Sequence, residues 1–258
     1  MAHGQIEDND TLDYYDLPVD IKNKGFLYEQ ALFHKLKDAS LVPQGFSPAG
    51  SDNLAPDLKF IWHGNEYNLE VKLDQKADYG QSGLRYVDDT WILDGSSAQA
   101  HVSMREMLTE IGIPRFVNSV DGWGGLGQPR KFLREEQGLK TSVSDHDYDY
   151  NTFLDKYIKI DSNTVSRYYN NKNIYYIHIG GMGTYYMGKD PAQMARSTDM
   201  AKFIPSLKLR IRKKGSSDHS KPYRFSLALL VDNKPLASNF DMSVDAHIHQ
   251  LTMNIKPT

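Results

Sequence analysis

Residues 54–73, LAPDLKFIWHGNEYNLEVKL, predict the β-hairpin around which the rest of the fold is built. The run from Asp57 to Trp62 is rich in apolar residues and has the length of a strand. Residues 63–65, His-Gly-Asn, supply a tight turn, because glycine and asparagine tolerate a positive φ. Residues 67–73 then alternate between apolar and polar types, which is the period of a strand with one buried face.

The polar face of this hairpin carries the candidate chemistry. Glu70 and Lys72 are two residues apart, so on a strand they point to the same side. The first strand begins at Asp57, and a hairpin brings this carboxylate beside the other two side chains. Two carboxylates form a hard-oxygen site for Mg²⁺, and an adjacent ammonium can orient a water molecule and offset charge that builds on a phosphate. Asp57, Glu70 and Lys72 are therefore the predicted catalytic residues of a metal-assisted phosphodiester hydrolase.

Pro56-Asp57 followed by Glu70-Val71-Lys72 resembles the motif of the PD-(D/E)xK nuclease superfamily. The resemblance covers about residues 22–112 and implies a restriction-endonuclease-like fold, with 5′-phosphate and 3′-hydroxyl products. It also implies a site for Mg²⁺, with Mn²⁺ as a substitute, formed by Asp57, Glu70, the backbone carbonyl of Val71 and a glutamate of the preceding helix. The alternative is an ordinary amphipathic hairpin whose Glu/Lys face is solvated.

The helix expected before the hairpin runs from Lys24 to about Asp38. Tyr28, Leu32 and Leu36 form a helical stripe, and further aromatic and aliphatic residues broaden it, so most of this helix should be buried. A glutamate inside such a helix is costly unless it is paired or bound to metal. Glu29 is therefore the candidate metal ligand, with exposure on the remaining polar face as the alternative.

Composition excludes several classes of protein. The chain has 258 residues, of which 40% are hydrophobic and 24% charged, as in an ordinary globular protein. It has no cysteine, which excludes disulfides, thiolate zinc sites and cysteine nucleophiles. No apolar run approaches the length of a membrane span, and the N-terminus lacks a signal pattern. A soluble, cytoplasmic protein without membrane contact is expected.

The expected fold is α/β, with a mixed central sheet flanked by helices and a β-rich C-terminal extension. Residues 1–20 are predicted to be an acidic arm, residues 21–164 a nuclease core, and residues 165–258 a β-rich region that packs on the core and contacts DNA. Within that region, residues 174–187 predict two strands around a glycine turn. The net charge is −3, and the arm holds six acids and no lysine or arginine, so the remainder carries +3. A mildly basic body is compatible with DNA binding.

Two segments are predicted to contact DNA. Residues 74–86 are polar, contain glycine and follow the site directly, where Gln81, Ser82 and Arg85 are expected to meet phosphates or base edges. Residues 207–214 alternate as a strand whose cationic face has no acid within it. The three side chains of that face are Lys208, Arg210 and Arg212. The alternative for the strand is a solubilising face or a protected edge.

These observations predict a Mg²⁺-dependent endodeoxyribonuclease that acts on double-stranded DNA. The resemblance favours a sequence-specific restriction-type enzyme, commonly a homodimer. A repair or junction-resolving nuclease is the alternative within the same class. Outside it, the alternatives are a nucleic-acid-binding protein without catalysis and a structural or assembly protein.

Overall fold

The computed structural model describes residues 24–48, 56–95, 99–213, 223–231 and 237–253. The chain forms two compact units, and each is described here by itself. Unit 1 comprises residues 1–77, 169–203 and 235–258, and unit 2 comprises residues 78–168 and 204–234. Both units draw on residues from the predicted core and from the predicted C-terminal region, because the chain leaves unit 1 and returns to it.

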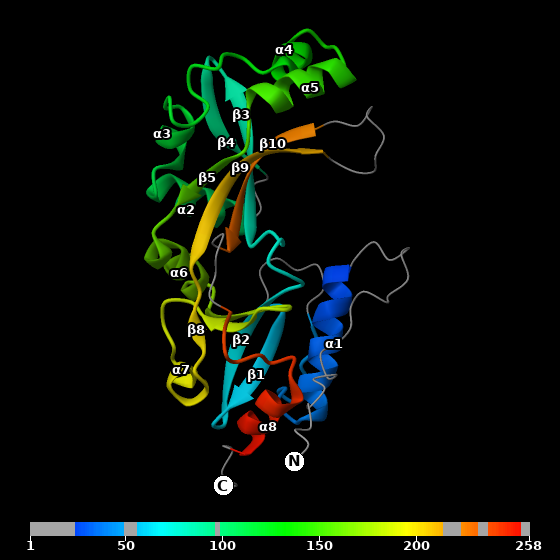
Figure 1. The fold of residues 1–258 in the computed structure, drawn as a ribbon, viewed down its shortest axis with the longest axis vertical. Coiled ribbons are helices and arrows are strands. Elements are labelled where there is room, and N and C mark those ends of the chain that lie inside the picture. The colour runs from blue at the N-terminus through cyan, green and yellow to red at the C-terminus, as the bar shows by residue number, and fades with distance from the viewer. Residues whose placement is uncertain (1–23, 49–55, 96–98, 214–222, 232–236, 254–258) are drawn as a thin grey trace, which may run out of the picture. The chain divides into compact units, whose positions relative to one another are not determined.

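Unit 1 contains a mixed five-stranded sheet with the order β1-β2-β6-β7-β8 (Figure 1). Its strands are β1 (Leu58–Trp62), β2 (Asn65–Lys72), β6 (Ile174–Ile179), β7 (Gly183–Tyr186) and β8 (Ala201–Lys202). β1 and β2 are antiparallel, whereas β2 pairs in parallel with β6. The predicted hairpin and the two predicted strands of residues 174–187 are confirmed.

The turn of the hairpin lies where its sequence predicts, but the second residue with positive φ is His63 rather than Asn65. His63 and Gly64 both have a positive φ, at 48° and 75°. Two consecutive residues with positive φ match the right-handed twist of the strands that they join. The resulting register pairs Leu58 with Leu69, so that apolar residues of the two strands share one face.

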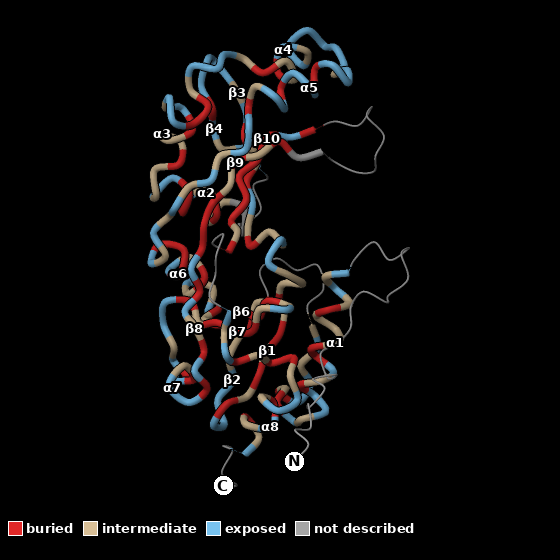
Figure 2. The backbone as a smooth tube through the Cα atoms, viewed as in Figure 1, coloured by how far each residue is buried: buried red, intermediate tan, exposed pale blue. Residues whose placement is uncertain are grey.

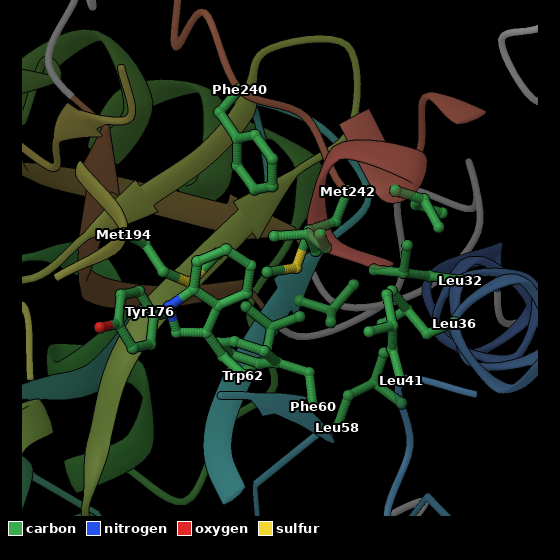
Figure 3. Close-up of a cluster of buried hydrophobic side chains, with 14 of the residues drawn as sticks. Leu32, Leu36, Leu41, Leu58, Phe60, Trp62, Tyr176, Met194, Phe240 and Met242 are labelled. Carbon is green, nitrogen blue, oxygen red and sulfur yellow. The ribbon is translucent and has the colours of Figure 1, made fainter. Parts of the chain in front are cut away.

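Helix α1 (Lys24–Asp38) packs its apolar stripe on this sheet. Tyr28, Leu32 and Leu36 are buried, as predicted, and Figure 3 shows the two leucines facing the residues of β1. Each fully buried leucine stabilises such a core by roughly 2 kcal/mol relative to an exposed one. The predicted helix bounds are confirmed. Unit 1 also contains α7 (Met194–Thr198) and α8 (Asp245–Met253).

Unit 2 contains an antiparallel sheet that curves as a half-barrel, with the order β4-β3-β10-β9-β5. Its strands are β3 (Gly80–Val87), β4 (Thr90–Asp94), β5 (Lys156–Lys159), β9 (Pro205–Lys213) and β10 (Tyr223–Val231). Figure 2 shows that buried residues concentrate along the strands of both sheets. From Gly80 onward, the polar segment of residues 74–86 is a strand that pairs with β10.

Five helices accompany the second sheet along the chain: α2 (Gln99–Glu110), α3 (Ile113–Val117), α4 (Arg130–Glu136), α5 (Val143–Thr152) and α6 (Ser162–Asn170). The described part of the chain thus has eight helices and two sheets, and the prediction of an α/β protein is confirmed. Within those same ranges, no helix has the length and apolar character needed to cross a membrane.

Candidate active site

The hairpin brings the three predicted catalytic side chains together. Asp57 immediately precedes β1, and its Oδ2 accepts a hydrogen bond of 2.8 Å from the backbone N–H of Val71. The Nζ atom of Lys72 lies 2.6 Å from Oε1 of Glu70 and 3.7 Å from Oδ2 of Asp57. Because the Val71 N–H lies between Glu70 and Lys72 in the chain, this bond fixes Asp57 beside both of them.

Glu29 of α1 interacts electrostatically with the same group. Burial is the main reason that the pKa of Glu29 is raised from 4.5 to about 7, and the charge of Asp57 raises it further. Glu70 adds to the repulsion, while Lys72 opposes it. The helix before the hairpin therefore contributes a carboxyl group that exchanges protons near neutral pH.

Asp57 is also perturbed. Burial first, and then the charge of Glu70, raise its pKa from 3.8 to about 6. Lys72, the hydrogen bond from Val71 and the charge of Lys172 oppose this rise without cancelling it. Lys172 is a cation that the sequence analysis did not include, because it precedes β6 and lies a hundred residues beyond Lys72 in the chain.

Lys72 is held in its charged form. Burial alone would lower its pKa, but the neighbouring Glu70, Asp57 and Glu29 raise it above its usual range. An ammonium can donate hydrogen bonds and neutralise charge, whereas it cannot accept a proton from water. The charge state of Lys72 therefore fits a role in positioning and charge stabilisation rather than in proton abstraction.

Helix α1, strand β2 and the turn after β6 approach one another closely next to this site. The N–H of Gly180, directly after β6, donates a hydrogen bond of 2.9 Å to the carbonyl oxygen of Lys72. A Cβ atom on Gly180 would lie 2.1 Å from the carbonyl oxygen of Leu73 and 3.0 Å from Cζ of Tyr28. Only glycine fits there, so Gly180 sets how closely α1, β2 and the turn after β6 approach.

A buried hydrogen-bond network links α1 to the sheet next to the site. His178 of β6 pairs with Val71 across the parallel ladder. Its Nε2 lies 2.5 Å from the hydroxyl of Tyr28, and its Nδ1 lies 3.0 Å from Oγ1 of Thr184. Burial is the main cause that lowers the pKa of His178 to about 4, although Asp241 opposes the change. The imidazole is therefore neutral at physiological pH and joins helix to strand.

The carboxylate oxygens of this site are chemically suited to bind a divalent cation. Glu29, Asp57 and Glu70 carry three negative charges when ionised, against one positive charge on Lys72, and carboxylate oxygens are the ligands that Mg²⁺ prefers. Among the residues that the structure describes, however, no three acidic or histidine side chains are grouped so as to hold a metal ion. The Lys72 ammonium contacts both hairpin carboxylates instead. The metal ligands Asp57, Glu70, Glu29 and the Val71 carbonyl remain predictions.

The predicted DNA contacts of β3 divide between its two faces. Gln81 and Arg85 are exposed on one face. Ser82 is buried on the other, where its hydroxyl donates a hydrogen bond of 3.1 Å to the carbonyl oxygen of Asp94. The prediction that Ser82 contacts DNA is corrected, because a strand directs successive side chains to opposite sides.

The cationic strand is β9, and two of its three predicted contacts are paired with acids. Lys208 lies 2.6 Å from Asp155, and Arg210 lies 2.5 Å from Asp78. No acid lies within the strand, as its sequence shows, but Asp155 and Asp78 reach it from other segments of unit 2. These pairs reduce the charge that Lys208 and Arg210 offer to a phosphate. The side chain of Arg212 lies outside the described residues.

Comparisons with protein-family models, with curated proteins and with solved structures find no match to this chain.

Proposed function

We propose that this chain is a metal-dependent endodeoxyribonuclease of the PD-(D/E)xK type. The observation that carries the proposal is the Val71 N–H bond to Asp57, which fixes that carboxylate beside Glu70 and Lys72. The helix before the hairpin adds Glu29, as the resemblance implies. A mixed sheet with a helix packed on it also agrees with the fold that the resemblance implies.

Asp57, Glu70 and Glu29, with the backbone carbonyl of Val71, would hold Mg²⁺. When bound, the ion would polarise a phosphoryl oxygen and make a water molecule more acidic. In its ionised form Glu29 would be the third carboxylate ligand, and the proton of the attacking water would pass to solvent. Lys72 donates hydrogen bonds to the phosphate oxygens as their negative charge grows. The water oxygen bonds to phosphorus, the bond to the 3′ oxygen breaks, and that oxygen leaves as a hydroxyl after it gains a proton.

The test is cleavage of plasmid and phage DNA by the purified protein, with Mg²⁺ or with EDTA. The variants Asp57→Asn, Glu70→Gln and Lys72→Ala should lose cleavage while retaining the wild-type circular dichroism spectrum. Glu66→Gln is the matched control, because Glu66 lies on the same strand but is exposed and pairs with Lys59. It should cleave like the wild type.

The pattern of products separates the enzyme classes. Discrete Mg²⁺-dependent fragments indicate a sequence-specific restriction-type enzyme, and a smear indicates a nonspecific nuclease. Preference for branched over linear DNA would instead indicate a junction-resolving enzyme. Cleavage that persists in all three variants would exclude the proposed mechanism. Each active site cuts one strand, so we expect a homodimer, which sedimentation would detect.

A nucleic-acid-binding protein without catalysis is the second candidate. The ion pair of 2.6 Å between Lys72 and Glu70 favours it, because Lys72 neutralises a carboxylate that a metal would otherwise contact. Binding of DNA that is unaffected by EDTA, together with no cleavage in Mg²⁺ or Mn²⁺, would support this candidate over the nuclease.

A further inference from the structure

One face of the antiparallel sheet in unit 2 carries small residues at its centre and arginines around them. On β10, Phe225 and Leu227 are buried toward the core, so Ser226 between them points to the opposite face. The register places Ser226 between Gly83 of β3 and Arg210 of β9. We define the arginine face as Gly83, Arg85, Arg210, Arg224 and Ser226.

Two polar groups at the floor of the arginine face lack partners. Oγ of Ser226 and Nε of Arg210 are buried, and neither forms a hydrogen bond with any part of the chain that the structure describes. Arg210 uses its Nη2 atom to contact Asp78, which leaves Nε unsatisfied. A buried polar group without a partner costs about 1–3 kcal/mol. Two adjacent groups of this kind, on neighbouring strands, indicate a place where a ligand completes the hydrogen bonding.

Two exposed arginines lie at the end of the same face. The pairing of β10 with β3 begins at Phe225 and Leu84, so Arg224 and Arg85 are the next residues on the two strands. Both side chains are exposed, and within the described ranges neither forms an ion pair with a carboxylate. Like charges on adjacent strands, which are about 5 Å apart, repel one another and destabilise the sheet.

An anion with regularly spaced charges would relieve this repulsion. The phosphodiester backbone has such charges, and the planar guanidinium group binds a phosphate through two parallel hydrogen bonds. Backbone contacts of this kind position a duplex without reading its sequence. The charge and the unmet hydrogen bonds of the face therefore match a nucleic-acid backbone.

We infer that the arginine face holds the phosphate backbone of the nucleic-acid substrate, with Arg85 and Arg224 as the charged contacts and with Ser226 and Arg210 beneath them. This inference rests on the proposed function, which takes the substrate to be a phosphodiester chain. It adds Arg224 and Ser226 to the contacts predicted from the sequence, and it replaces Lys208, which pairs with Asp155.

The experiment measures binding without cleavage. Fluorescence anisotropy with a labelled duplex of about 30 base pairs, in EDTA and over about 50–200 mM NaCl, gives the affinity and its dependence on salt. The variants are Arg85→Gln, Arg224→Gln, the double variant and Ser226→Ala. Arg196→Gln is the matched control, because Arg196 is an exposed arginine on α7 of unit 1.

The double variant should lose about 10- to 100-fold in affinity at about 100 mM NaCl, and its slope of log K against log salt should decrease by about 2. Ser226→Ala should weaken binding without changing the slope, since it removes no charge. Arg196→Gln should bind like the wild type. A double variant with the affinity and slope of Arg196→Gln would overturn the inference, as would binding to heparin but to no DNA.

The outcome separates this inference from the proposed function. If the wild type cleaves no DNA yet binds it through Arg85 and Arg224, the nuclease proposal fails and the arginine face stands. If cleavage depends on Lys72 but binding is unaffected by both arginine substitutions, the nuclease proposal stands and the arginine face fails.

Discussion

Replacing Asp57 with asparagine should stabilise the protein at neutral pH. Asparagine has nearly the same shape and retains an oxygen that can accept the Val71 N–H bond, so the change chiefly removes the charge. In the wild type, burial and the charge of Glu70 make ionisation of Asp57 unfavourable and raise its pKa from 3.8 to about 6. The asparagine variant avoids the free-energy cost of burying this charge.

The sign and size follow from proton linkage. Between the unfolded and folded pKa values the folded state binds more protons, so the Asp57 contribution to wild-type stability falls as pH rises through this window. The two values differ by about two pH units, and at about 1.4 kcal/mol per unit the full cost is about 3 kcal/mol. About 2 kcal/mol of this develops between about pH 4.5 and pH 7.5.

Urea unfolding followed by circular dichroism tests this prediction at those two pH values. The free energy of unfolding of Asp57→Asn, relative to the wild type, should increase by about 2 kcal/mol from the lower to the higher pH. Asp121→Asn is the control for removal of a carboxylate, since Asp121 is exposed. A variant that is less stable than the wild type at the higher pH would refute the reasoning. It would mean that attraction to Lys72 outweighs burial and repulsion.

Four further predictions concern the same unit. Mg²⁺ should raise the melting temperature of the wild type by mass action but not that of Asp57→Asn, and an equal rise in both would contradict a metal at Asp57. Glu29→Gln should weaken Mg²⁺ binding, so that half-maximal cleavage needs a higher Mg²⁺ concentration than in the wild type, which a Mg²⁺ titration of the cleavage rate checks. Gly180→Ala should cost more than about 2 kcal/mol by urea unfolding, because the added Cβ would lie 2.1 Å from the Leu73 carbonyl oxygen, and unchanged stability would disprove this tight packing. His178 is neutral when folded, so the free energy of unfolding of the wild type relative to His178→Gln should fall by about 2–3 kcal/mol from about pH 7 to pH 4.5, which urea unfolding of both proteins checks.

The sequence by itself determined the local geometry of the candidate site. The glycine turn, the alternation along each strand and the two-residue spacing of Glu70 and Lys72 are all short-range features. They made Asp57, Glu70 and Lys72 predictable neighbours. The apolar stripe of α1 likewise predicted the face that packs on the sheet, but it left the exposure of Glu29 open, and the structure has Glu29 partly buried.

The tertiary structure decided what surrounds that hairpin. Nothing near Lys72 in the chain indicates that the strand beginning at Ile174 becomes the parallel neighbour of β2, which places His178 and Gly180 beside the site. Parallel neighbours need a long crossover connection, and here the crossover includes much of unit 2, so local periodicity cannot find the partner strand.

The same reason explains the errors on the cationic strand. Alternation correctly gave Lys208 and Arg210 a common face, but their acidic partners come from segments that are distant in the chain, Asp78 being 132 residues before Arg210. Ser82 was misplaced because its strand pairs with β10, a segment far along the chain, and this pairing places Ser82 on a buried face. Sequence periodicity identifies a strand and its two faces, but only the packed structure determines which side chains pair across them and which remain open to a ligand.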